Sequence, residues 1–273
     1  MKTRALLLKK ALANSSALAL LVTLTACGAQ GSSAAPADQL SQVREKGKIV
    51  VAMEGQWAPW TYHDETDKLV GFDVEVAEGI AEKMGVAVEF VEGEWDGLFA
   101  GLDAGRYDCI ANGVEVTDER AEKYDFSTPY GYIHTSLIVK NDNTDINSFE
   151  DLAGKTTTNS IASTYEMIAR EYGVKDVLGV DTIDETMNIV LSGRADATLN
   201  ANVSFYDYMS VHPDAALKEV AQTKDASLVC IPIRKGETAF KEAVDKAIDE
   251  LRAEGRLSEI STKYFGSDIT NNN

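Results

Sequence analysis

The sequence predicts an α/β fold in which parallel sheets are covered by helices on both faces. Strand-like runs alternate with amphipathic helical runs along the chain after residue 45, and this alternation is typical of parallel sheets. Several helical runs end at a glycine, the residue that most readily adopts the left-handed conformation found at helix C-termini. In such folds ligands bind where strands end and helices begin, so the loops at those points are expected to carry the functional residues.

The length and charge of the chain narrow its class. Its 273 residues, 44% of them hydrophobic, are enough for two compact units. There is no internal repeat and no run of 18 or more apolar residues, so no ordinary membrane span is expected. The formal net charge of −18 argues against nucleic acid as a partner and against adsorption to an anionic membrane surface.

The N-terminus has the pattern of a secretion signal. A basic start, MKTRALLLKK, precedes a short apolar core, and Leu24-Thr25-Ala26-Cys27 then matches a lipobox, the cleavage and lipidation signal of bacterial lipoproteins. We therefore expect a signal peptide over residues 1–26 and a lipid anchor, such as palmitate with diacylglycerol, on Cys27. Residues 27–39 are rich in Gly, Ser and Ala and predict a flexible tether. The alternative is an ordinary signal peptide with an incidental cysteine.

The remaining cysteines and the histidines do not predict a metal site. Cys109 and Cys230 each lie in an apolar strand-like run and are expected to be buried thiols, although a disulfide between them is an alternative. His63, His134 and His212 are scattered, without the i,i+4 spacing of a ligand pair. No metal and no cofactor is therefore expected.

The first elements of the body follow from hydrophobic patterning. Residues 48–53, KIVVAM, form a compact apolar strand. The loop after it holds Trp57 and Trp60, of which one is expected to plug the core and the other to form a ligand wall. The run 69–85 is apolar on one helical face, and Gly85 ends it. The same patterning then predicts a strand over 86–91, a short helix through 98–102 that follows Trp95 and Asp96, and a strand over 107–114.

The stretch from Tyr107 to Tyr130 has the features of an anion site. Thr117 stands where a helix N-cap is expected, with acids in the first turn and Arg120 close behind. Exposed N–H groups at a helix N-terminus favour an anion, and a guanidinium can bind a carboxylate through two parallel hydrogen bonds. The alternative is a surface arginine that offsets the neighbouring acids.

The second part of the body continues the alternation. Its last long helix is the clearest, because Phe240, Val244, Ile248 and Leu251 share one face and Gly255 lies just past its end. The expected elements before it are strands over 135–140, 155–160 and 176–180, a helix within 161–173 that starts at Ser163 and Thr164, a helix over 183–192, a strand leading into a helix over 193–208, and a strand over 227–236.

The run LVGFDVEVAEGIAEKMGVAVEFVEGEWDGLFAGLDAGRYDCIANGVEVTDERAEKYDFSTPY resembles the bacterial extracellular solute-binding proteins for polar amino acids, the receptors of ABC importers. The resemblance continues through FEDLAGKTT, GRADATLN and FKEAVDKAIDELRAEGRLSEISTKYFG. It implies a two-lobed periplasmic-binding-protein-like fold with two crossover strands and a cleft between the lobes. Lobe 1 would hold residues 40–132 plus 228–273, and lobe 2 residues 133–227, with crossings near 130–135 and 226–228.

The resemblance also implies roles for individual residues. Arg120 matches the arginine that binds the ligand α-carboxylate, and Ser163 and Thr164 match the helix start that completes this site. Gly113 matches the position whose backbone meets the ligand amino group. Trp57 and Trp95 match positions that sandwich the ligand side chain, which leaves Trp60 as the expected core plug. Glu54 and Asn200 match polar positions that face the cleft.

Two positions depart from the family pattern. Ala201 replaces an aspartate that usually pairs with the ligand α-ammonium, and Glu115 replaces a Ser or Thr. A buried ammonium without a partner costs several kcal/mol. We therefore expect Glu115, together with Asn202 or Asn200, to bind the ammonium. The alternative is that Glu115 points to solvent and that water solvates the ammonium.

The function implied is capture of an amino acid for a membrane permease. Two acids and one arginine disfavour glutamate and aspartate as ligands and favour polar zwitterions or ligands with an extra ammonium. Cystine is a candidate, and arginine, lysine and glutamine stay open. The chain is expected to act as a monomeric, non-enzymatic lipoprotein on the outer face of the membrane or in the periplasm. The alternatives are an enzyme of the cyclohexadienyl dehydratase type and a ligand sensor.

Overall fold

The structure, a computed structural model, describes residues 38–272, which form a mixed α/β body. Cys27, the signal peptide and nearly all of the predicted tether lie outside these residues. The last two residues of the predicted tether are described: Asp38 is the N-cap of helix α1 (Gln39–Lys46), and Gln39 is the first residue of that helix. Within residues 38–272 no helix is both long and apolar enough to cross a membrane.

The first of two five-stranded sheets, here called sheet I, is mixed. Its strand order is β5 (Ala87–Glu92), β1 (Lys48–Met53), β6 (Cys109–Ile110), β15 (Pro232–Arg234) and β7 (Tyr124–Phe126). β1 pairs in parallel with β5 and β6, as expected, whereas β15 runs antiparallel to β6 and β7. The expectation of purely parallel sheets is therefore wrong. The predicted strand over 107–114 is also shorter, because pairing with β1 spans only the two residues of β6.

Helices cover both faces of sheet I. One face carries α1, α2 (Phe72–Met84), α8 (Thr238–Ala253) and α9 (Arg256–Phe265), and the other carries α3 (Trp95–Asp103). Neighbouring strand residues supply the two cores, since Val51 packs toward the larger core and Ala52 toward the α3 side. Trp95 is the first residue of α3 and does not precede the helix as predicted. Gly85 ends α2 in the left-handed conformation, as expected.

The second sheet, sheet II, is built on the same plan. Its order is β11 (Asp176–Gly179), β10 (Thr156–Asn159), β12 (Ala197–Ala201), β9 (Thr135–Lys140) and β13 (Leu217–Gln222). The parallel trio β11, β10 and β12 is followed by antiparallel β9 and β13. The polar strand β13 was not predicted. The helices around this sheet are the 3₁₀ turn η1 (Phe149–Leu152), α5 (Thr164–Glu171), α6 (Ile183–Leu191) and α7 (Asn202–Val211).

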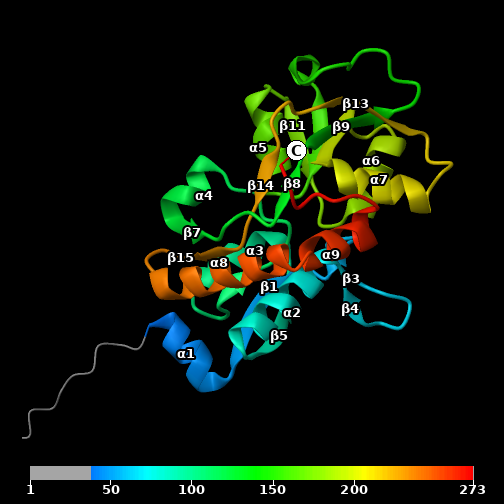
Figure 1. Cartoon of the computed structure of the whole chain (residues 1–273). Coiled ribbons are helices and arrows are strands. Elements are labelled where there is room, and N and C mark those ends of the chain that lie inside the picture. Colours follow the sequence, from blue (N-terminus) through cyan, green and yellow to red (C-terminus); the bar gives the residue numbers. More distant parts are fainter. Residues whose placement is uncertain (1–37, 273) are drawn as a thin grey trace, which may run out of the picture. The chain divides into compact units, whose positions relative to one another are not determined.

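Two short segments pass between the sheets. β8 (Gly131–Ile133) and β14 (Ser227–Val229) pair antiparallel and lie side by side between sheets I and II (Figure 1). They are the two crossover strands that the family resemblance implied. The prediction of a single strand over 227–236 is wrong. The chain forms β14, which ends at Val229, and then β15, which begins at Pro232, and these two strands belong to different sheets.

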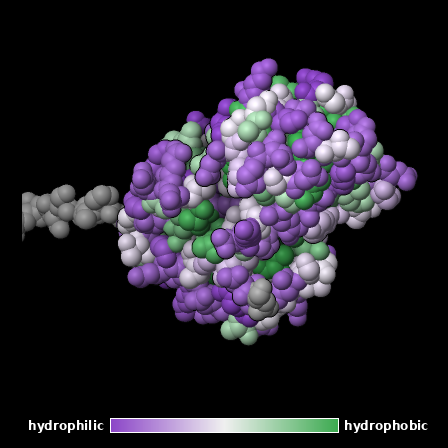
Figure 2. All heavy atoms as spheres, turned by 90° about the horizontal axis from the view of Figure 1, so that it is seen from above, coloured by the Kyte–Doolittle hydropathy of each residue, from purple (hydrophilic) through white to green (hydrophobic). Residues whose placement is uncertain are grey.

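The loop after β1 folds into a small antiparallel sheet of β2 (Gln56–Trp57), β3 (Thr61–His63) and β4 (Leu69–Val70). Trp60 lies within it, is fully buried and packs on Phe72 and Phe265, as expected for the core plug. The outer surface of the body is mostly hydrophilic on the face seen in Figure 2, in keeping with the acidic composition.

Candidate functional site

A cavity is lined by residues from the loops of both sheets. All of the predicted ligand-binding residues except Asn202 line it, namely Glu54, Trp57, Trp95, Gly113, Glu115, Arg120, Ser163, Thr164 and Asn200. Sheet I and its loops supply the first six, and sheet II and its loops supply the rest. Concave sites that combine aromatic walls with a few convergent polar groups are where small ligands bind.

Arg120 projects into the cavity from the short helix α4 (Asp118–Lys123). The Thr117 hydroxyl accepts a hydrogen bond from the Arg120 backbone N–H, which is the N-cap predicted from the sequence. Arg120 as a residue is 8% exposed. Its Nη1 donates to Glu115 O at 2.9 Å and to Thr164 Oγ1 at 3.0 Å, and its Nη2 donates to Ala162 O at 3.1 Å. Arg120 therefore joins the loops of the two sheets and is not a surface arginine.

Aromatic rings and a helix N-terminus complete this end of the cavity. The Arg120 guanidinium lies over the rings of Trp95 and Phe99, with 5.2 and 5.3 Å from its central carbon to the ring centroids. Ser163 caps α5 by accepting from Glu166 N–H, and Thr164 is the first helical residue. A guanidinium beside the N-terminus of an eight-residue helix is a chemically suitable place for a carboxylate. We call Arg120, Glu115 and Thr164 the arginine end of the cavity.

Glu115 is buried, being 3% exposed, and does not point to solvent. Its backbone forms an isolated bridge to Val229, so it extends the pairing of β14. The side-chain oxygen Oε2 has no hydrogen-bond partner among the described residues. Burial raises the pKa of Glu115, whereas Ser227 and the positive charge of Arg120 lower it. A buried carboxylate of this kind has a strong preference for a cationic partner.

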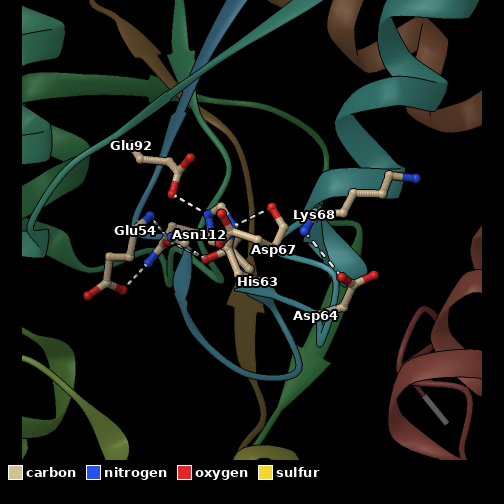
Figure 3. A network of polar contacts seen from close by, with 9 residues as sticks. Glu54, His63, Asp64, Asp67, Lys68, Glu92 and Asn112 are labelled. Carbon is tan, nitrogen blue, oxygen red and sulfur yellow. Dashed lines mark hydrogen bonds and ion pairs between the residues drawn. The ribbon is translucent and has the colours of Figure 1, made fainter.

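Glu54 stands at the carboxyl end of β1, and Asn112 donates a hydrogen bond to it through its side-chain amide. The Asn112 oxygen in turn accepts from Glu54 N–H at 2.8 Å. Figure 3 shows this pair beside a separate contact between His63 and Glu92. Burial raises the pKa of Glu54 to about 7, Asn112 opposes the shift, and the charge of Asp181 adds to it. Glu54 thus changes its charge near neutral pH.

Gly113 is held by a residue that the sequence reasoning missed. Asp73, in the first turn of α2, accepts hydrogen bonds from Gly113 N–H and, at 2.7 Å, from the Tyr130 hydroxyl. Asp73 is fully buried, and burial raises its pKa to about 7. With its N–H occupied, Gly113 can offer only its carbonyl to a ligand amino group. The signal was the acid at the start of α2 in the motif GFDVEVA, which looks like an ordinary helix-dipole acid.

The two tryptophans of the β1 loop have different surroundings. Trp57 lines the cavity and stacks on Trp60, with ring centroids 5.4 Å apart and 23° between the planes. Trp60 donates from its indole nitrogen to Ser204 Oγ of α7 at 2.9 Å. The predicted sandwich of a ligand between Trp57 and Trp95 stays a prediction, since Trp95 is also stacked with Arg120.

The two asparagines predicted to bind the ligand, Asn200 and Asn202, lie in different places. Asn200 lines the cavity, and its Oδ1 accepts from Ala201 N–H. Asn202 does not line the cavity, because its Oδ1 accepts from His134 N–H beside the crossover strands. The expectation that Asn202 assists at the cavity is therefore wrong, and Ala201 itself is completely buried in β12. The sequence reasoning instead missed Asn159 and Asp181, which lie at the ends of β10 and β11 and do line it.

The two cysteines within residues 38–272 are not paired with each other. Cys109 and Cys230 are buried free thiols, and burial raises the pKa of Cys109 strongly and that of Cys230 to about 12. Within residues 38–272 no group of three or more His, Cys, Asp or Glu side chains is arranged to hold a metal ion. The described cavity offers a ligand charge, hydrogen bonds and aromatic contact.

Two sheets joined by paired crossover strands, with a polar cavity lined from both, define a two-lobed binding protein. Residues 49–267 match the bacterial extracellular solute-binding proteins, family 3, and the chain belongs to that family.

Relatives and solved structures agree with this assignment. The chain is 38% identical to a probable amino-acid ABC transporter-binding protein of Haemophilus influenzae, over 86% of this chain and 91% of that protein. It is 36% identical to the L-cystine-binding protein TcyA of Bacillus subtilis, over 96% of this chain and 100% of that protein. Among solved structures, an ancestral arginine-binding protein bound to arginine is 35% identical with a TM-score of 0.75, covering 81% of this chain and 99% of that chain.

Proposed function

We propose that the protein is the substrate-binding component of an amino-acid ABC importer and that it captures a polar or cationic amino acid, with cystine as one candidate. The observation that carries the proposal is the position of Arg120, whose guanidinium contacts Thr164 and Ala162 from the loops of the other sheet. A ligand carboxylate at this point contacts groups from both sheets at once. The names of the relatives support the same class of cargo.

The proposed mechanism is capture followed by closure around the crossover strands β8 and β14. The arginine end needs groups from both sheets, so a ligand gains its full set of contacts only when the two are close together. A ligand with this differential affinity shifts the population toward the closed arrangement. The permease would then recognise the closed form.

The proposal includes attachment to a membrane. Cys27 is the proposed lipidation site, and residues after it are the proposed tether, which would keep the receptor near its permease and raise their effective concentration. The sequence pattern around Cys27 supports this part of the proposal. Metabolic labelling with a fatty acid that is lost in Cys27→Ala would test it directly.

The experiment for the binding function is a thermal-unfolding screen of the full-length protein with the common amino acids and cystine. A ligand at about a thousand times its dissociation constant adds about 4 kcal/mol of stability, which raises the midpoint by several degrees. Arg120→Ala is expected to abolish the shift, because truncating one partner of a desolvated charge pair costs about 2–5 kcal/mol. Arg194→Ala, an exposed arginine outside the cavity, is the matched control. A full shift retained in Arg120→Ala contradicts the proposal.

One observation favours a second candidate, an enzyme of the cyclohexadienyl dehydratase type. Glu54 is a largely buried acid with a pKa of about 7, which suits proton transfer to a leaving group. Incubation of the protein with prephenate, followed by ultraviolet absorbance for phenylpyruvate, tests it. Turnover that disappears in Glu54→Gln would support the enzyme, and no turnover together with amino-acid binding would exclude it.

A further inference from the structure

The two ends of the cavity differ in charge. At the arginine end, the charge of Arg120 acts on Glu115 and lowers its pKa. Glu54 and Asp181 also line the cavity, from the loops after β1 and β11, and among the described residues neither forms an ion pair with Arg120. The negative charge of Asp181 adds to the upward shift in the pKa of Glu54. We call Glu54 and Asp181 the acidic end of the cavity.

The acidic end is built from both sheets. Glu54 follows β1 of sheet I, whereas Asp181 lies between β11 and α6 of sheet II, immediately before the N-cap Thr182. Asp181 is exposed and lines the cavity, whereas Glu54 is half-buried and accepts a hydrogen bond from Asn112. Two carboxylates brought together from different sheets repel each other unless a cation lies between them.

A buried acceptor without a partner gives an independent indication of a ligand that donates hydrogen bonds near Asp181. Asn159 is 2% exposed and lines the cavity. Its amide nitrogen donates to Thr198 Oγ1 and Leu199 O, which fixes the orientation of the amide, and its Oδ1 has no partner among the described residues. Its backbone oxygen accepts from Val180 N–H, which places it next to the Asp181 loop. The Asn159 side-chain oxygen therefore needs a donor, which an ammonium or guanidinium group supplies.

A charge balance shows what the ligand must supply. Among the described residues that line the cavity, Arg120 is the single cationic side chain, and Glu54, Glu115 and Asp181 are the acids. The α-carboxylate of an amino acid pairs with Arg120, and its α-ammonium pairs with Glu115. This leaves Glu54 and Asp181 without a cation, and a ligand with a neutral side chain brings none.

We propose that Glu54 and Asp181 together bind a cationic group at the far end of the ligand, so that the cargo is an amino acid with a second ammonium or guanidinium group. Asp181 is a specificity-determining residue in this arrangement, because it adds a carboxylate from sheet II to the one from sheet I. The inference rests on the proposed function, since it assumes that the arginine end holds an amino-acid head group.

Both dibasic amino acids and cystine carry the required distal cation. The charge balance favours the dibasic class, because the second carboxylate of cystine would meet two acids and no second arginine among the described lining residues. Trp57 provides an apolar wall for the aliphatic part of either ligand.

The test is isothermal titration calorimetry of the full-length protein with matched ligand pairs. Arginine and citrulline have nearly the same shape but differ in charge, and lysine and norleucine differ in the distal ammonium. Cystine is compared with the mixed disulfide of cysteine and 3-mercaptopropionate, which lacks that ammonium. We expect the charged member of the pair that binds to be at least about tenfold tighter, because the neutral member leaves the half-buried Glu54 carboxylate without a cation.

Substitutions show which residues cause the difference in affinity between charged and neutral ligands. Glu54→Gln is expected to remove most of the difference between the charged and neutral ligands. Asp181→Asn is expected to reduce it by about fivefold or less, because the carboxylate is exposed and its effect is screened. Asp184→Asn, an exposed acid three residues further on that does not line this cavity, is the control and should leave the difference unchanged.

The outcomes separate this inference from the proposed function. Arg120-dependent binding of a neutral amino acid, with citrulline or norleucine as tight as its charged partner, would overturn the inference and leave the proposed function standing. If cystine binds, no dibasic amino acid binds and the distal ammonium is required, the role of Glu54 and Asp181 is supported. The preference for a dibasic amino acid over cystine is then overturned. No Arg120-dependent binding of any amino acid would overturn both.

Discussion

The arginine end and the acidic end of the cavity are built in different ways. Arg120 is fixed by three hydrogen bonds, two of them to backbone carbonyls, and by two aromatic rings. At the acidic end, Glu54 has one side-chain partner, Asn112, and Asp181 is exposed. One end is preorganised by backbone geometry, and the other depends on side chains, of which Glu54 has a pKa raised to about 7.

The two ends therefore have different roles in the proposed function. The arginine end gives affinity for amino acids in general, and the acidic end determines which amino acid binds most tightly. A preorganised guanidinium binds the group that all amino acids share, so it cannot distinguish among them. Discrimination comes from groups that are left unpaired by the wrong ligand. Changes at the arginine end should therefore weaken all ligands together, whereas changes at the acidic end should alter their ranking.

The largest effect is expected from Gly113→Ala, which lies beside the arginine end. Gly113 has φ +55°, and a Cβ there would stand 2.8 Å from the Trp57 ring and 3.2 Å from the buried Trp60 ring. Backbone strain and the clash together should lower the free energy of unfolding by about 3 kcal/mol and weaken all ligands equally. Urea denaturation and calorimetry measure the two effects.

Gly105→Ala is the control for this substitution. Gly105 has φ +67°, but a Cβ there would meet no atom within 4 Å. It should therefore show the backbone strain alone, about 1 kcal/mol, with ligand affinity unchanged. A Gly113→Ala protein no less stable than Gly105→Ala would mean that the Trp57–Trp60 pair can move away.

A smaller effect, confined to the acidic end, is expected from pH. The pKa of Glu54 is raised to about 7, so the carboxyl is mostly protonated at pH 6 and mostly ionised at pH 8. A distal cation binds the ionised form, so its binding releases a proton and its affinity should rise about tenfold from pH 6 to pH 8. Titrations of arginine at several pH values measure this slope. Glu54→Gln should flatten it, and a slope that persists in that variant would assign the titration to another group.

The smallest effect is expected from Ser204→Ala, which lies outside the cavity. This change removes the acceptor of the buried Trp60 indole N–H, and one unsatisfied donor costs about 1 kcal/mol or slightly more of unfolding free energy. Ser210→Ala, an exposed serine on the same helix, is the control. The ratio of arginine to citrulline affinity should stay the same, and a changed ratio would show that the Trp60–Ser204 contact influences ligand choice.

The arginine end could be predicted from the sequence because its signals are local. A threonine N-cap, two acids and an arginine fall within four residues, and one turn of helix fixes their geometry. The acidic end could not be predicted in full, because Asp181 is one polar residue in a polar loop and meets Glu54 only after two sheets are assembled. Asp73 was missed for a related reason, since its contact with Gly113 joins residues 40 positions apart.

The errors in the strands have a common physical cause. Hydrophobic runs show that a segment is buried but not which sheet buries it, so the run 227–236 gave one strand where the chain forms β14 and β15. The polar strand β13 has no apolar alternation to identify it, and its pairing with β9 depends on tertiary structure. The helices were predicted more accurately, because caps and glycine stops mark their ends.

The pairing of β8 with β14 has a consequence for how such a receptor can change its cargo. Because the chain leaves and returns on neighbouring strands, residues 134–226 form a continuous insertion whose two ends lie together. A recombination event at these two points would exchange Asp181 and Asn159 as one cassette, while Arg120 and Glu54 stay with the host sequence. New preferences could therefore arise in a single genetic step, without rebuilding the carboxylate-binding arginine.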